Sequence, residues 1–306
     1  MKKILSLTLL LVFAAAAHAQ TDFSKVQMKA TKVAGNVYML EGAGGNIGVS
    51  VGDDGLLIVD DQFAPLADKI RAALKGLADK KLRFILNTHW HGDHTGANAA
   101  FGPEATIIAH DNVRKRLSTE QRSTVFNRTT PPSPKEALPV ITFDHTLTVH
   151  FNGEEIRAIH FPQGHTDGDS VIFFTASNVV HLGDDFFAGR FPFVDLDSGG
   201  TVEGLVRNIG DIITKIPEGA KLIPGHGPIS TVDDLKSYHR MLQETTEIVR
   251  QKISGGKTLE QIKSEGLPEE WKPWGTGFIS TDRWLETIHR SLTARKQKQS
   301  TDYAHS

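Results

Sequence analysis

Three histidines and an aspartate fall within six consecutive positions, at His89, His91, Asp93 and His94. They directly follow the mostly apolar run 82–86, which has the length and composition of a buried β-strand. Imidazole together with carboxylate is a donor set that suits zinc. A polar loop that is histidine-rich by chance is the alternative, but burying unpaired histidines would be costly. The motif therefore predicts a fold in which the end of a strand carries a metal-binding loop.

Three further candidate residues lie at the ends of predicted strands. His165 precedes the strand that begins at Val171, Asp184 follows the run 179–182, and His226 stands between two glycines after Ile223. Taken singly, each is more typical of a structural turn than of a ligand. Together with the first motif, they predict one site that is assembled from loops at one edge of a sheet.

Short apolar runs alternate with turns along the first two thirds of the chain. The predicted strands cover residues 37–40, 47–51, 56–59, 82–86, 106–109, 171–174 and 179–182, with a hairpin over 147–161 that turns at 152–153. The predicted helices cover residues 65–77, 201–216 and 231–253. Residues 128–139 contain four prolines and are expected to form a surface loop. Two blocks of strands, each followed by helices, predict an α/β (α+β) sandwich rather than a doubly wound sheet.

The N-terminal residues have the pattern of a targeting segment. Lys2 and Lys3 precede an apolar run over 4–17 that is too short to span a bilayer, and Ala17-His18-Ala19 matches a small-x-small cleavage site. The sequence thus predicts a cleavable signal peptide at residues 1–19 and a periplasmic or secreted mature chain without stable membrane association. An uncleaved membrane anchor is the alternative.

The composition excludes several classes of function. Removal of Lys2 and Lys3 takes the formal charge from -2 to -4, which provides no basic surface for nucleic acid. The chain has no cysteine, so no thiolate can act as nucleophile or metal ligand. Neither a glycine-rich dinucleotide fingerprint nor a phosphate-binding loop is present. A small-molecule substrate is the expected partner, and the oligomeric state is not determined by these features.

Four motifs in a fixed order resemble the metallo-β-lactamase superfamily over roughly residues 33–228. They are His-x-His-x-Asp-His at 89–94, Gly-His-Thr at 164–166, Gly-Asp at 183–184 and Pro-Gly-His-Gly at 224–227. The resemblance implies a four-layer αββα sandwich with metals at one edge of the paired sheets. It implies a metallo-β-lactamase-like domain over residues 20–230 and a helical C-terminal extension over 231–306 that packs on it.

The resemblance also implies a role for each candidate residue. A first zinc would be held by His89, His91 and His165, a second by Asp93, His94 and His226, and Asp184 would bridge the two. Two Zn²⁺ ions are expected, with iron or manganese as alternatives. Asp93 is the expected catalytic residue, because it can also accept a hydrogen bond from the attacking water. Asp60, at the end of the strand 56–59, resembles the carboxylate that supports the metal loop in this family.

These features favour an exported zinc-dependent hydrolase that cleaves a small ester, thioester, lactone or lactam. The lack of cysteine and the presence of Asp184 differ from the zinc β-lactamases and are more similar to glyoxalase-type thioesterases, lactonases and phosphodiesterases. Diiron flavoproteins of the superfamily have an acidic residue where this chain has His91. A genuine β-lactamase and a non-catalytic zinc-binding protein are the alternatives, and the intact Asp93 disfavours the second.

Aromatic residues near Asp184 leave two interpretations open. The set Phe186, Phe187, Arg190, Phe191 and Phe193 would line a substrate groove, with Arg190 available for an anionic group, or the aromatic residues would pack as a minor core instead. Residues 195–200 are expected to cap the helix that begins near Thr201. Trp90 is expected at the cleft entrance, and the C-terminal tryptophans are expected to pack as part of a helical cover. These are Trp271, Trp274 and Trp284.

Overall fold

A computed structural model describes residues 22–304 of the chain, with side chains described up to residue 294. The predicted signal peptide at residues 1–19 lies outside the described residues. Within the described range, no helix combines the length and the hydropathy needed to cross a membrane.

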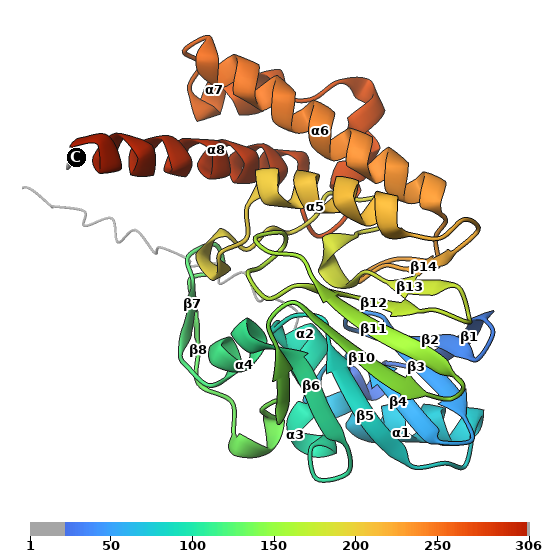
Figure 1. The fold of residues 1–306 in the computed structure, drawn as a ribbon. Helices are drawn as coiled ribbons and strands as arrows, with labels where there is room; N and C mark the ends of the chain where they lie inside the picture. Colours follow the sequence, from blue (N-terminus) through green and yellow to red (C-terminus); the bar gives the residue numbers. More distant parts are fainter. Residues whose placement is uncertain (1–21, 305–306) are drawn as a thin grey trace, which may run out of the picture.

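Seven strands form the first sheet, in the order β1-β2-β3-β4-β5-β6-β9 (Figure 1). They are β1 (Lys29–Ala34), β2 (Val37–Glu41), β3 (Ile47–Gly52), β4 (Gly55–Val59), β5 (Leu82–Asn87), β6 (Thr106–His110) and β9 (Ile141–Phe143). The strands from β1 to β4 are antiparallel, whereas β4, β5, β6 and β9 are parallel. Because parallel strands end at the same edge, the segments that follow β4 and β5 emerge next to each other.

Five strands form the second sheet, in the order β10-β11-β12-β13-β14. They are β10 (Thr146–Phe151), β11 (Glu154–His160), β12 (Ser170–Phe174), β13 (Val179–His181) and β14 (Lys221–Ile223). The predicted hairpin is confirmed as β10–β11, with Asn152 at φ 53° and Gly153 at φ 79°, as a tight turn requires. β13 and β14 are parallel neighbours, so their carboxyl ends also meet at one edge.

The alternation of side chains along β4 explains how the first sheet is buried on both faces. Leu57 and Val59 pack into the core between the two sheets, whereas Leu56 and Ile58 pack on the other face against α1 (Ala67–Leu77). All five residues of β4 are buried, and the same holds for β12. A strand that is apolar on both faces is stable only between two covering layers.

Helices form the two outer layers. α1 and α3 (Asn98–Phe101) contribute to the core outside the first sheet, and α5 (Val202–Lys215), α6 (Val232–Ser254) and α8 (Thr281–Ala304) lie outside the second (Figure 1). The shorter helices are α2 (Gly92–Thr95), α4 (Asp111–Leu117) and α7 (Leu259–Glu265). The predicted αββα sandwich with C-terminal helices is thereby confirmed. The proposed division at residue 230 stays a prediction.

The C-terminal helices share one apolar core with the second sheet. Trp271 and Trp284 are buried in it, and Trp274 packs against it. α6 begins with a reciprocal capping box in which Thr231 and Asp234 satisfy each other's backbone amides. The tryptophans of the tail therefore act as packing residues, as expected.

A two-stranded hairpin occurs where the sequence analysis predicts no strands. β7 (Gln121–Ser123) pairs with β8 (Arg128–Thr130), and a short 3₁₀ turn follows at Lys135–Ala137. The prediction of a surface loop without regular structure over residues 128–139 is wrong for β8 and for this turn, whereas β7 lies before that range. Strands of three mostly polar residues carry no apolar alternation, so the sequence pattern gives no signal for them.

Ser50 lies within a Gly-x-Ser-x-Gly sequence, the pattern of a nucleophile elbow in serine hydrolases. In the structure this segment is the middle of β3, and Ser50 is fully buried with its hydroxyl accepting a hydrogen bond from Asn152. A nucleophile must be exposed at a strand-to-helix turn. Ser50 is therefore a structural residue.

Candidate metal centre

The first group of predicted ligands surrounds one carboxylate oxygen of Asp184. The donor atoms of His89, His91, His165 and Asp184 all lie within 4.8 Å of one another. His165 Nε2 is 2.9 Å from His91 Nδ1 and 3.6 Å from Asp184 Oδ2. His89 Nε2 is 3.9 Å from the same oxygen of Asp184. Four donors thus converge on one point.

The second group lies on the other side of Asp184. The donor atoms of Asp93, His94 and His226 also lie within 4.8 Å of one another. Asp184 Oδ1 is 3.1 Å from His94 Nε2 and 3.4 Å from His226 Nε2. Because its two oxygens face different groups, Asp184 has the geometry of a bridging carboxylate. The fold thus brings all seven sequence-predicted residues into two adjoining clusters.

The sheet topology explains this convergence. The histidine-rich segment follows β5, His165 lies between β11 and β12, Asp184 follows β13, and His226 follows β14. Gly225 permits the close approach of the last two segments, since a Cβ at this position would lie 2.0 Å from Asp184 Oδ1. Only glycine fits between these segments without a shift of the backbone.

Hydrogen bonds at the second nitrogen of four ligand imidazoles, those of His89, His91, His94 and His165, fix the orientation of the rings. His94 Nδ1 is 2.7 Å from Asp60 Oδ2, and His165 Nδ1 is 2.7 Å from the carbonyl oxygen of Phe193. The Thr88 hydroxyl donates to Asp60 Oδ2 and lies 3.0 Å from His89 Nδ1. Such contacts set the tautomer, so that the other nitrogen presents its lone pair to a metal. Asp60 occupies the supporting place that the resemblance implies.

The charge distribution of the two groups suits bound cations. Burial lowers the pKa of His165 to about 4, so that its imidazole is neutral near pH 7, as metal coordination requires. Burial opposes protonation of His226, but the Asp184 and Asp93 carboxylates outweigh it and raise the pKa of His226 to about 9. The same negative potential stabilises a metal ion.

Two buried polar atoms at the centre lack a hydrogen-bond partner among the described residues. They are His89 Nε2 and Asp184 Oδ1. Buried polar atoms are nearly always hydrogen-bonded, so these two atoms are suited to a ligand of opposite character, such as a metal ion. The donors are imidazole nitrogens and carboxylate oxygens, which suit zinc and also iron or manganese. The residues present therefore fit divalent metal ions.

Asp195 is a residue of the site that the sequence analysis did not identify. Its Oδ2 lies 2.9 Å from His91 Nε2, 104 residues away along the chain, and the side chain is buried. The expectation that residues 195–200 cap the following helix is wrong for Asp195, because Thr201 caps α5 and Asp195 caps the short turn Leu196–Ser198. No local sequence signal reveals a contact made only by the tertiary fold.

Replacement of Asp195 by alanine should weaken metal binding at the first group by about 10–100-fold, since His91 loses the carboxylate that orients its ring. Metal affinity would be measured by competition with a chromogenic chelator, and Asp195→Asn should restore part of it because the amide oxygen can still accept from His91. Asp197→Asn is the matched control in the same turn. Wild-type metal affinity in Asp195→Ala would contradict this role.

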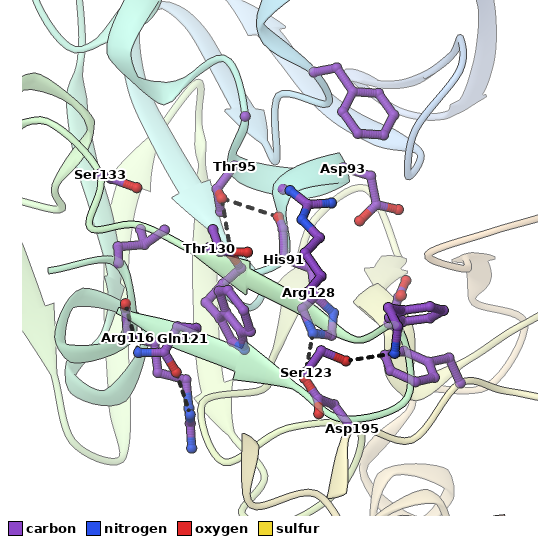
Figure 2. Close-up of a pocket in the computed structure, with 18 of the residues that line it drawn as sticks. His91, Asp93, Thr95, Arg116, Gln121, Ser123, Arg128, Thr130, Ser133 and Asp195 are labelled. Atoms are coloured by element: carbon purple, nitrogen blue, oxygen red, sulfur yellow. Dashed lines mark hydrogen bonds and ion pairs between the residues drawn. The ribbon is translucent and has the colours of Figure 1, made fainter. Parts of the chain in front are cut away.

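A cavity of about 770 Å³ opens directly onto the clusters. His91, Asp93, Asp184 and His226 lie at its inner end, and residues of the β7–β8 hairpin form another wall (Figure 2). Trp90 lines the cavity, as expected for a residue near the cleft. A small molecule held here would lie against the donor atoms.

Both interpretations of the aromatic segment after Asp184 hold in part. Phe187, Arg190, Phe191 and Phe193 line the cavity. Phe186 is fully buried instead, with its ring centroid 5.2 Å from that of Tyr238. The segment thus contributes to the groove and to the core together.

The histidines that match no motif do not join the two clusters within the described part of the chain. His110 and His160 stack on each other with ring centroids 3.6 Å apart. His181 is buried and lies 3.0 Å from the carbonyl oxygen of Asn46. These residues pack as structural groups.

Comparison with known proteins places these observations in a family. The model of the metallo-beta-lactamase superfamily matches residues 31–226. A protein described as a probable metallo-hydrolase of Methanocaldococcus jannaschii is 32% identical over 49% of this chain and 72% of its own length. The atrochrysone carboxyl ACP thioesterase of Aspergillus fumigatus is 26% identical over 84% of this chain and 53% of its own length.

The relatives differ from this chain in length, and a solved structure shares its fold. The chain spans only 40% of one further curated relative. The crystal structure of the DIM-1 metallo-beta-lactamase matches 72% of this chain and 99% of its own chain, with a TM-score of 0.59 and 17% identity. At that identity the likeness concerns the fold.

Proposed function

The chain belongs to the metallo-beta-lactamase superfamily and is a metal-dependent hydrolase. We propose that it is an exported enzyme with two zinc ions, and that it cleaves a small ester, thioester, lactone or lactam. The observation that carries the proposal is the pair of donor clusters that share Asp184 and open into one cavity. A thioesterase among the relatives supports the thioester class. Export rests on the sequence pattern of residues 1–19.

The residues at the inner end of the cavity have distinct tasks in such a reaction. When bound, the metal ions supply a Lewis acid and lower the pKa of water towards ~7. Burial alone would raise the pKa of Asp93, but His94 and His226 lower it to about 2, so its carboxylate is ionised. So weak a base accepts a hydrogen bond from an attacking water and orients it, rather than removing its proton completely.

The cavity walls complete the arrangement. Phe187 stacks on His226 with ring centroids 5.1 Å apart, and Phe193 lies 5.7 Å from His91. These rings pack against the ligand imidazoles and make part of the inner end of the cavity apolar. An apolar surrounding strengthens the electrostatic interactions made with the substrate.

Turnover by the mature, zinc-loaded protein, with and without a chelator, tests the proposal. The substrates would be an activated acyl ester, an acyl thioester, a lactone, a β-lactam and an activated phosphodiester. We expect chelator-sensitive hydrolysis of the ester, thioester or lactone. Turnover of the β-lactam well above the others would favour the β-lactamase alternative. Binding of metal without turnover of any substrate would favour a non-catalytic metal-binding protein.

A further inference from the structure

The β7–β8 hairpin presents one of its two faces to the cavity. Residues of a strand alternate between faces, and paired residues of a hairpin share a face. Gln121 pairs with Thr130, and Ser123 pairs with Arg128. These four residues line the cavity, whereas the third pair, Arg122 with Thr129, does not. The register of the hairpin therefore selects Arg128, and not Arg122, for the cavity.

Arg128 has no partner for its charge. Within the described part of the chain, its guanidinium makes neither a hydrogen bond nor an ion pair. Figure 2 shows its side chain extending from β8 towards the side of the cavity where Thr95 and Asp93 lie. Arg116, which also lines the cavity, is held instead by Asp167 through two hydrogen bonds of 2.6 and 2.7 Å. The guanidinium N–H groups of Arg128 are thus available to donate hydrogen bonds to an anionic molecule in the cavity.

The carboxylates in the cavity are already engaged. Asp93 and Asp184 belong to the donor clusters, and Asp195 is bonded to His91. The negative charge of the cavity is therefore concentrated at its inner end, where metal ions would neutralise it. Arg128 on the hairpin wall gives another part of the cavity positive charge, and Arg190, which also lines the cavity, adds to it from the segment after Asp184.

Aromatic rings cover the same side of the cavity. Phe126, at the tip of the hairpin, is 45% exposed, and its ring centroid lies 5.3 Å from that of Phe193 and 5.8 Å from that of Phe278. Phe278 is 72% exposed. Exposed aromatic side chains that gather at a cavity are typical of a binding surface. Together they offer an apolar wall that leads from His91 outwards.

Polar contacts hold the hairpin in this position. The backbone amide and the hydroxyl of Thr124, at the tip, donate to Asp197 Oδ2 over 2.6 and 2.7 Å. Arg290 of α8 donates to the same hydroxyl over 3.2 Å. At the base, Arg116 donates to Gln121 over 2.9 Å. A hairpin fixed at both ends presents Arg128 and Phe126 at defined places.

We propose that the β7–β8 hairpin determines substrate choice, and that the enzyme prefers substrates with a bulky apolar body and an anionic group that Arg128 binds. The reacting bond then lies at the donor clusters, the apolar body lies against Phe126, Phe193 and Phe278, and the anion lies at the hairpin. This inference rests on the proposed hydrolase function and names the substrate class of the same site.

Two esters with the same leaving group and chain length test the preference. They are 4-nitrophenyl hexanoate and the mono-4-nitrophenyl ester of hexanedioic acid, which has a carboxylate in place of the terminal methyl group. The zinc-loaded wild type should show a kcat/KM about tenfold higher for the acid, because a charge-assisted hydrogen bond contributes that much. Arg128→Ala should bring the ratio of the two kcat/KM values to about one, and Arg128→Lys should keep part of the preference. Arg122→Ala is the matched control on the opposite face of the hairpin.

Binding measurements separate this inference from the hydrolase function. Calorimetric titration with 6-phenylhexanoate and 6-phenylhexan-1-ol would be made on the zinc-loaded and on the chelated protein. Arg128→Ala should weaken binding of the carboxylate about tenfold in both forms and leave binding of the alcohol unchanged, even if neither ester is hydrolysed. Equal binding of the carboxylate by wild type and Arg128→Ala would overturn the inference. An equal decrease in kcat/KM for both esters in Arg128→Ala would also overturn the inference.

Discussion

Replacement of Asp93 by asparagine should lower turnover of the best substrate by a factor on the order of 10²–10⁴ while both metal ions stay bound. The amide keeps the size of the side chain and one oxygen, but it loses the negative charge that orients the attacking water. Asp93 Oδ2 lies 3.3 Å from His226 Nε2, and the side chain is 29% exposed at the inner end of the cavity. Asp93 thus lies where it can contact both the second donor cluster and a substrate in the cavity.

Metal content by mass spectrometry and steady-state kinetics on the same preparation would check this result. Asp53→Asn makes the same chemical change at a fully exposed position in the β3–β4 turn and should leave both quantities unchanged. Turnover within a few-fold of the wild type in Asp93→Asn would contradict a catalytic role. Loss of metal would instead identify Asp93 mainly as a ligand.

Replacement of Trp284 by alanine should lower the free energy of unfolding by about 3–5 kcal/mol. Trp284 is completely buried, its indole N–H donates to the Thr245 hydroxyl over 3.1 Å, and its ring stacks near Phe191. The loss of stability combines two contributions: the burial free energy of a large apolar side chain, and the cost of the cavity that remains in the core. Thr245 keeps a partner in the carbonyl oxygen of Met241, so no polar group becomes orphaned.

Urea unfolding of the metal-free protein measures this effect without the contribution of metal binding to stability. Lys236→Ala provides the control on α6, because its side chain is 58% exposed and its ion pair with Asp233 contributes at most ~1 kcal/mol. A change below about 1 kcal/mol in Trp284→Ala would show that the C-terminal cover contributes little to the stability of the domain.

Much of the fold is determined by local sequence patterns. The apolar runs that become β3, β4, β5 and β12 are recognisable because β4 and β12 are buried along their whole length and β3 and β5 are buried over part of theirs. Their alternation or continuity follows from the side-chain geometry of a strand. The helices α5 and α6 begin at Thr201 and Thr231, whose side chains cap the first backbone amides. Such signals depend on neighbours within a few residues, so they survive without knowledge of the fold.

The seven predicted ligands were also accessible from the sequence, because each stands in a short motif next to a glycine or within the histidine-rich segment. Their convergence in two clusters follows from the strand ends that meet at one edge of the paired sheets. The sequence motifs identify the candidate metal ligands. The parallel pairing of β13 with β14 then brings Asp184 next to His226.

Only the tertiary structure decided which other residues serve the site. Asp195 supports His91, and Arg128 faces the cavity while Arg122 does not. Short polar strands such as β7 and β8 have no hydrophobic periodicity, and the face that a residue presents depends on the register with its partner strand. Local sequence therefore determined which residues are metal-ligand candidates and which strands and helices form the four layers. Long-range packing determined that Asp195 supports the His91 ring and that Arg128 lines the cavity, because those contacts join segments with no common local pattern.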